Sequence, residues 1–118
     1  MRFTQRQEGD QVIFTLSGQL LGGVDAEAIC AAAMSAIQKG ARIVVLNMEE
    51  VTWVNSTGLG TLISCHLAAK KNRAAFRLAG VSKRIGSILS ITRLNTIFEV
   101  FETEDEARRA AAPFPSAG

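Results

Sequence analysis

The chain has 118 residues and a mass of 12.6 kDa, which fits one compact domain. Hydrophobic residues make up 47% and charged residues 20%, a balance that is typical of a globular protein and excludes a disordered chain. A net charge of only +2 argues against a nucleic-acid binder. The longest aliphatic run, Ile43 to Leu46, is far too short for a membrane span, and the first residues contain no apolar signal-peptide core. We therefore expect a cytoplasmic protein without membrane insertion.

The first elements in chain order are two predicted strands and a helix. Phe3–Gln7 is expected as an edge strand, and the turn residues Glu8-Gly9-Asp10 separate it from Val12–Ser17, which alternates like a strand. Asp25 then begins a pattern of apolar residues at three- and four-residue steps, which predicts a helix that ends at Gly40.

The middle of the chain predicts a buried strand followed by a second helix. Residues 42–48 form a continuous apolar run, which is typical of a strand buried on both faces of a parallel sheet. Residues 51–54 form a short extended piece, and a helix begins near Asn55 or Ser56 and ends at residues 70–72. Its expected apolar face consists of Leu59, Leu62, Ile63, His66 and Leu67.

The last part predicts two more strand–helix pairs. Residues 75–79 form a short strand, and Ser82 is the expected N-cap of a third helix that buries Ile85, Ile88 and Leu89. Residues 97–101 alternate as a last strand, and residues 103–106 have the capping-box spacing that opens a final helix. The order ββαβαβαβα predicts one α/β domain over residues 1–112, with a mixed, mostly parallel sheet, and a disordered tail over residues 113–118.

Most conventional active sites are excluded. His66 is the only histidine, and it lies ten residues, or about 15 Å along one helix, from Ser56, so the two cannot form a catalytic pair. Cys65 and His66 are neighbours whose side chains diverge, and Cys30 is expected as a small core residue, so no metal site is predicted. A reducing compartment would keep both cysteines as thiols. Gly58-Leu59-Gly60 lacks the further residues of a nucleotide-binding loop, and no cofactor is predicted.

Charge is unevenly distributed near the end of the chain. Seven basic and no acidic residues lie between Lys70 and Arg93, and five acidic and no basic residues lie between Glu99 and Glu106. These stretches fit either solvated helix faces or a docking surface for an acidic protein.

The segment with the most functional information is the junction between the buried strand and the second helix. Asn55-Ser56-Thr57-Gly58 places a hydroxyl at a helix N-terminus, where free N–H groups favour phosphate. Ser56 is therefore a candidate phosphorylation site, although Asn55 or Ser56 could equally serve only as a helix cap. Gly58 and Gly60 remove side-chain bulk, which would let a partner approach the backbone.

This segment resembles the STAS domain family and, within it, the bacterial anti-sigma factor antagonists. The resemblance rests on residues 44–48 and the motif Asn55-Ser56-Thr57-Gly58-Leu59-Gly60, supported by residues 16–20 and 78–82, and it covers residues 3–112. It implies a STAS-like fold with helices packed mainly on one face of the sheet. It also implies a non-enzymatic regulator, monomeric or weakly dimeric.

The resemblance further implies a switch. Such antagonists bind an anti-sigma factor that is a serine kinase, and this binding releases a sigma factor. The kinase then phosphorylates the motif serine of the antagonist, and a phosphatase later removes the phosphate. The phosphorylation site here would be Ser56, or Thr57 as the alternative. The implied partner-binding residues are Asn55, Ser56, Thr57, Gly58, Leu59, Gly22, Asp25, Ser82 and Lys83.

Two other functions remain open. Asn55 stands where the family has aspartate, which favours an unphosphorylated STAS scaffold or an accessory subunit of a stress-signalling complex or lipid transporter. A nucleotide-binding domain has the least support, because the chain contains no P-loop.

Overall fold

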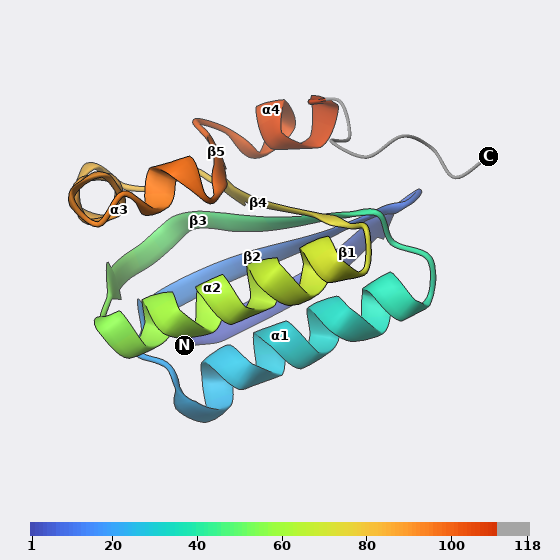
Figure 1. Cartoon of the computed structure of the whole chain (residues 1–118), viewed down its shortest axis with the longest axis horizontal. Helices are drawn as coiled ribbons and strands as arrows, with labels where there is room; N and C mark the ends of the chain where they lie inside the picture. Colours follow the sequence, from blue (N-terminus) through green and yellow to red (C-terminus); the bar gives the residue numbers. More distant parts are fainter. Residues whose placement is uncertain (111–118) are drawn as a thin grey trace.

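The computed structural model describes residues 1–110, and within them the predicted order of strands and helices is confirmed (Figure 1). The elements are β1 (Arg2–Glu8), β2 (Gln11–Leu20), α1 (Gly23–Gln38), β3 (Ile43–Val54), α2 (Ser56–Lys71), β4 (Ala75–Ala79), α3 (Lys83–Ile91), the 3-10 turn η1 (Leu94–Thr96), β5 (Glu99–Phe101) and α4 (Glu104–Arg109). The expected tail, residues 113–118, lies outside the described residues.

The strands form one mixed sheet in the order β1-β2-β3-β4-β5. β1 runs antiparallel to β2, and the pairs β2–β3, β3–β4 and β4–β5 are parallel. The carboxyl ends of β2 and β3 therefore lie side by side, and Leu20 pairs with Val54. In α/β sheets, ligand and partner sites concentrate at such an end.

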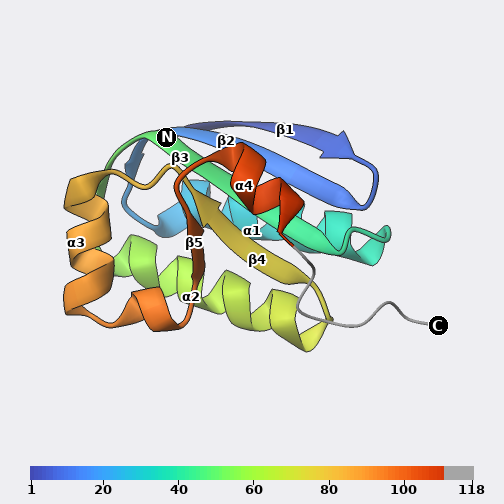
Figure 2. The ribbon, with the colours of Figure 1, turned by 90° about the horizontal axis from the view of Figure 1, so that it is seen from above.

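The helices lie mainly on one face of the sheet, as expected. α1 and α2 cover one face, α4 lies across part of the other, and α3 stands at one end (Figures 1 and 2). Alternation along β3 divides its side chains between the faces: Val44 and Leu46 belong to the main core, and Val45 packs with Ala107 of α4. The fully buried Arg77 holds α4 in place by donating from Nη1 to Ala107 O at 2.8 Å and Ala110 O at 2.9 Å.

Strand β3 is longer than the sequence predicts. The prediction ended the buried strand at residue 48 and began a separate extended piece at residue 51, which left Glu49 and Glu50 outside both. The structure instead continues the strand to Val54, since β2 extends to Leu20 and supplies a parallel neighbour, with Glu50 opposite Ser17. Because β3 ends at Val54, only Asn55 separates it from the start of α2 at Ser56.

The buried face of α2 is rotated relative to the prediction. Leu59 and Leu62 are buried as expected, but Leu67 is 56% exposed, while Cys65 and Ala69 are buried. Small residues are preferred there because α2 packs against α1 as well as against the sheet. Leucine is more hydrophobic than cysteine or alanine, so the sequence analysis placed Leu67 on the buried face in place of Cys65 and Ala69.

The expectation of two free thiols is wrong. Cys30 of α1 and Cys65 of α2 form a disulfide with their Cα atoms 5.5 Å apart, inside the range that such a bond requires. A separation of 35 residues carries no local signal for this pairing, which arises from the packing of the two helices. Within residues 1–110, no helix has the length and apolarity needed to cross a membrane.

Candidate functional site

The strand-to-helix junction is fixed by the side chain and backbone of Asn55. Its Oδ1 accepts a hydrogen bond from Gly58 N at 2.8 Å, which caps the N-terminus of α2. Its backbone N–H donates to Leu20 O at 3.2 Å, which ties the junction to the end of β2. The sequence left open whether Asn55 or Ser56 is the cap, and the structure assigns that role to Asn55. Ser56 is thus not needed as the cap.

Gly58 has a structural role that the sequence did not reveal. It is buried, and a Cβ atom built on it would lie 2.2 Å from Leu20 O. Gly58 therefore lets α2 approach the backbone of β2, and it offers no surface to a partner, contrary to the prediction. Gly60 is exposed and a Cβ atom there would meet open space, so at Gly60 the predicted backbone access exists.

Ser56 and Thr57 are both exposed at the beginning of α2. No acidic residue occupies the first turn of this helix, so its N-terminal partial positive charge has no counter-charge there. Within residues 1–110, no hydrogen bond engages the Ser56 hydroxyl. Thr57 is more constrained, because a Cβ atom on Gly22 would lie 2.4 Å from Thr57 Cγ2.

The other predicted partner-binding residues fall into two groups. Gly22 adopts a left-handed conformation, with φ +84°, and brings the start of α1 against Thr57. Asp25 is exposed in the first turn of α1, and Leu59 is buried beneath the junction. The structure thus brings Gly22 against Thr57, whereas the Asp25 carboxylate lies 3.4 Å from the N-terminal amine of Met1.

Ser82 and Lys83 lie at the start of α3, a different element from the helix that carries Ser56. Ser82 is the predicted N-cap, accepting from Ile85 N at 3.2 Å, and both residues are exposed. The link to the junction runs through the next residue, because the Arg84 guanidinium stacks over the Trp53 ring at 5.5 Å from its centroid. Trp53 and Arg84 line a surface depression together with Gln19 and Thr52.

Three exposed apolar residues lie at the ends of the elements that meet at this junction, and the sequence analysis did not identify them. Leu21, which follows β2, is 47% exposed, Val24 in the first turn of α1 is 82% exposed, and Trp53 near the end of β3 is 37% exposed. We define the corner surface as Leu21, Val24, Trp53, Ser56 and Thr57. Clustered exposed apolar residues with a polar rim are typical of a protein-binding surface. A tryptophan two residues before the cap was the available sequence signal.

His66 belongs to a separate region. It packs edge-on against Phe76 and Phe98, with ring centroids 6.2 and 5.5 Å apart, as a boundary histidine. Burial and, secondarily, the charge of Lys70 lower the pKa of its imidazole. A small pocket beside it is lined by Lys70, Phe76 and Glu99 among others. Within the described part of the chain, no group of three or more His, Cys, Asp or Glu side chains could hold a metal ion.

Comparisons with known proteins agree with this architecture. A family model for the STAS domain matches residues 3–107. The anti-sigma-B factor antagonist of Staphylococcus aureus is 37% identical over 65 residues, which span 55% of this chain and 60% of that protein. The chain therefore matches less than two thirds of the length of this curated relative.

Solved structures share the fold at low sequence identity. An anti-sigma factor antagonist of Mycobacterium paratuberculosis has a TM-score of 0.76 and 19% identity, covering 91% of this chain and 90% of that one. The Bacillus cell fate determinant SpoIIAA in its phosphorylated form has a TM-score of 0.70 and 22% identity, covering 91% of this chain and 96% of that one. With the family model matching residues 3–107, these findings show that the chain belongs to the STAS domain family.

Proposed function

We propose that this protein is an anti-sigma factor antagonist that binds an anti-sigma factor through the corner surface and releases a sigma factor. The observation that carries the proposal is the exposed Ser56 hydroxyl at the N-terminus of α2, among exposed apolar side chains. The names of the staphylococcal relatives support the same role. In this role the chain supplies no catalytic group and no cofactor, and it acts in the cytoplasm as a monomer or weak dimer.

We further propose that the anti-sigma factor is a serine kinase and that phosphorylation of Ser56 ends the interaction. A phosphate adds about −1.5 to −2 charges. Its position at a helix N-terminus suits the fold of the antagonist itself, because the free N–H groups there favour an anion. In the complex, the same charge would be buried against apolar residues of the corner surface. An unpaired charge in an interface costs several kcal/mol, so the complex dissociates, and a phosphatase restores binding.

Ser56 is the better acceptor of the two candidates at this junction. The methyl group of Thr57 packs against Gly22, so its side chain is committed to the contact between α1 and α2. Ser56 is exposed, and within residues 1–110 no hydrogen bond engages its hydroxyl. A kinase can therefore take the Ser56 hydroxyl into its active site without separating the two helices.

The test is phosphorylation by the serine-kinase anti-sigma factor of the source organism, with ATP, followed by mass spectrometric mapping. We expect one phosphate on Ser56 in the wild type and none on Ser56→Ala. Ser64→Ala is the matched control, because Ser64 is an exposed serine two turns further along the same helix. Phosphate on Thr57 alone would assign the phosphorylation site to Thr57 instead of Ser56. Absence of phosphate from both residues would refute the proposed regulation by phosphorylation.

A second candidate function is an unphosphorylated scaffold or accessory subunit. The observation in its favour is Asn55, which makes the capping bond to Gly58 at 2.8 Å and adds no negative charge beside Ser56. Purification of the protein from its source followed by sizing separates the two. A large particle or a transporter ATPase that co-purifies would favour the scaffold, and an equimolar complex with a kinase would favour the switch.

A further inference from the structure

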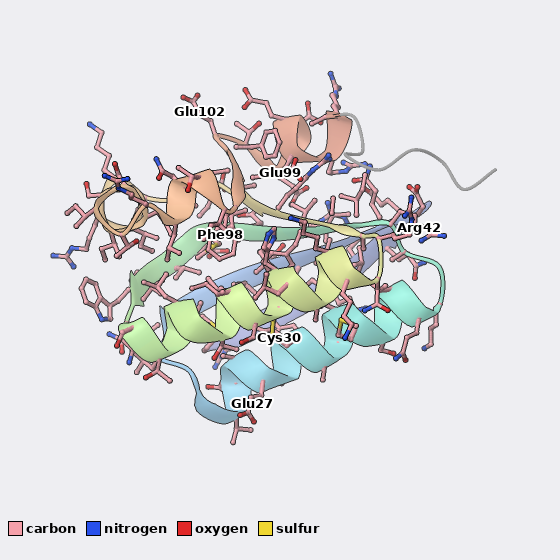
Figure 3. All side chains as sticks on the ribbon, viewed as in Figure 1. Glu27, Cys30, Arg42, Phe98, Glu99 and Glu102 are labelled. Atoms are coloured by element: carbon pink, nitrogen blue, oxygen red, sulfur yellow. A yellow bond between two sulfur atoms is a disulfide. The ribbon has the colours of Figure 1, made fainter. Side chains whose placement is uncertain are left out.

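The disulfide between Cys30 and Cys65 lies between the two helices whose N-terminal ends carry the corner surface (Figure 3). Both cysteines sit inside their helices, two to three turns from the helix starts, where Gly22 of the α1 junction touches Thr57 of α2. The bond therefore fixes the spacing of α1 and α2 close to the proposed docking site. The fold itself rests on the shared core and does not depend on this link for its topology.

The two sulfur atoms differ in accessibility. Cys65 is buried, with 5% of its surface exposed, whereas Cys30 is half-buried. Cys30 also lines an open cleft between α1 and α2, which has a volume of about 530 Å³. Thr57, Gly60, Thr61 and Ser64 of α2 and Glu27 of α1 form the rest of its wall. A small molecule in the cleft would meet Cys30 and would not meet Cys65.

We propose that Cys30 is a thiol–disulfide exchange site for a low-molecular-weight thiol of the glutathione class. The thiolate attacks Cys30 Sγ, the bond between the two cysteines breaks, and the electron pair leaves on Cys65 Sγ. A second thiolate attacks the thiol's own sulfur in the mixed disulfide and releases Cys30 as a thiolate. The protein has then gained two electrons and two protons, and two thiol molecules have been oxidised to one disulfide. The reverse steps, with that small disulfide as oxidant, restore the bond.

Exchange at Cys30 changes the proposed docking site in two ways. The mixed disulfide places a substituent in the cleft beside Thr57, within the wall that continues to the corner surface. Full reduction leaves the spacing of α1 and α2 to packing alone, so the contact between Thr57 and Gly22 is less tightly constrained. Binding must then constrain that contact, which weakens affinity by about fivefold. This consequence rests on the proposed function, whereas the exchange reaction does not.

The first experiment measures the exchange alone. Protein purified without reductant is treated with iodoacetamide, and a second sample is treated briefly with glutathione, acidified and mapped by mass spectrometry. We expect no alkylation of the untreated protein and glutathione on Cys30 in clear excess over Cys65. Two alkylated cysteines without reductant, or glutathione in equal amounts on both cysteines, would overturn the proposal.

The second experiment measures the consequence, with the anti-sigma factor as partner. Oxidised wild type is compared with dithiothreitol-treated wild type, and Cys30→Ser is measured with and without dithiothreitol as the matched control. We expect about fivefold weaker binding of the reduced wild type and no effect of dithiothreitol on Cys30→Ser. Equal affinities of the oxidised and reduced wild type would refute the coupling. Failure of the oxidised protein to bind at all would refute the proposed function and leave the exchange result standing.

Discussion

Replacement of Gly58 by alanine should separate the end of β2 from the start of α2. A Cβ atom at this position would lie 2.2 Å from Leu20 O and 2.9 Å from Leu20 C, and both are backbone atoms that cannot rotate away. The whole junction must shift to admit the methyl group. That shift also strains the hydrogen bond from Asn55 N to Leu20 O, which is 3.2 Å long.

The expected loss of stability follows from two opposing effects. Alanine is favoured over glycine inside a helix by about 1 kcal/mol. Overpacking a close contact costs about 1–3 kcal/mol, and weakening one buried hydrogen bond costs about 1 kcal/mol. Gly58→Ala should therefore destabilise the protein by about 1–3 kcal/mol in total. For a chain of this length, each kcal/mol lowers the melting temperature by about 4 °C.

Gly60→Ala is the matched control, because Gly60 lies in the same helix and a Cβ atom there meets open space. It keeps the helix-propensity gain and should raise the stability by up to about 1 kcal/mol. Thermal denaturation of the two variants beside the wild type measures the difference. Equal melting temperatures for Gly58→Ala and Gly60→Ala would refute the conclusion that Gly58 is required by its contact with Leu20.

Three further predictions concern stability. Asn55→Ala should cost about 1 kcal/mol through loss of the helix cap, and Asn55→Ser should restore most of it in urea denaturation. Burial lowers the pKa of His66 in the folded state, so the unfolded chain binds a proton first as the pH falls below about 6.5, and the stability of the fold declines there. In His66→Leu the melting temperature should therefore change less between pH 7 and pH 5 than in the wild type. An equal change in the two proteins would contradict this. The disulfide closes a loop of 35 residues, so its reduction should lower the free energy of unfolding by about 4 kcal/mol, measured by calorimetry. An unchanged melting temperature in dithiothreitol would contradict the presence of the disulfide.

The order of strands and helices could be predicted because local signals agreed with the fold. Helices α3 and α4 begin one residue after the expected caps Ser82 and Thr103. Helix α2 begins one residue after Asn55, one of the two caps that the sequence left open. In each helix the side chain of the cap accepts the hydrogen bond that defines it. Apolar alternation and continuous apolar runs identified the strands. These signals act within a few residues, so they do not require knowledge of distant contacts.

The features that could not be predicted all depend on distant parts of the chain. The continuation of β3 through Glu49 and Glu50 depends on the parallel neighbour β2, whose Ser17 lies opposite Glu50. The pairing of Cys30 with Cys65 requires the packing of α1 on α2. In each case the structure depends on which distant residues become neighbours in the fold, and local sequence patterns do not contain that information.

Of the candidate site, the structure tests only the exposure and packing of the predicted residues. Ser56 and Thr57 are exposed as the motif indicated, but Gly58 is occupied by an internal contact with β2. Trp53 was visible in the sequence as a tryptophan two residues before the cap, but its stacking under Arg84 of α3 depends on two elements that meet only in the folded chain.

The most direct test of the account is the affinity of the anti-sigma factor for the protein before and after phosphorylation of Ser56, measured by isothermal titration calorimetry. We predict that the phosphate weakens binding by at least about 30-fold, equivalent to about 2 kcal/mol of unpaired charge. The melting temperature should stay within about 4 °C of the unmodified protein, because the helix N-terminus accommodates the charge at less than about 1 kcal/mol. Equal affinities of the two forms would contradict the central claim.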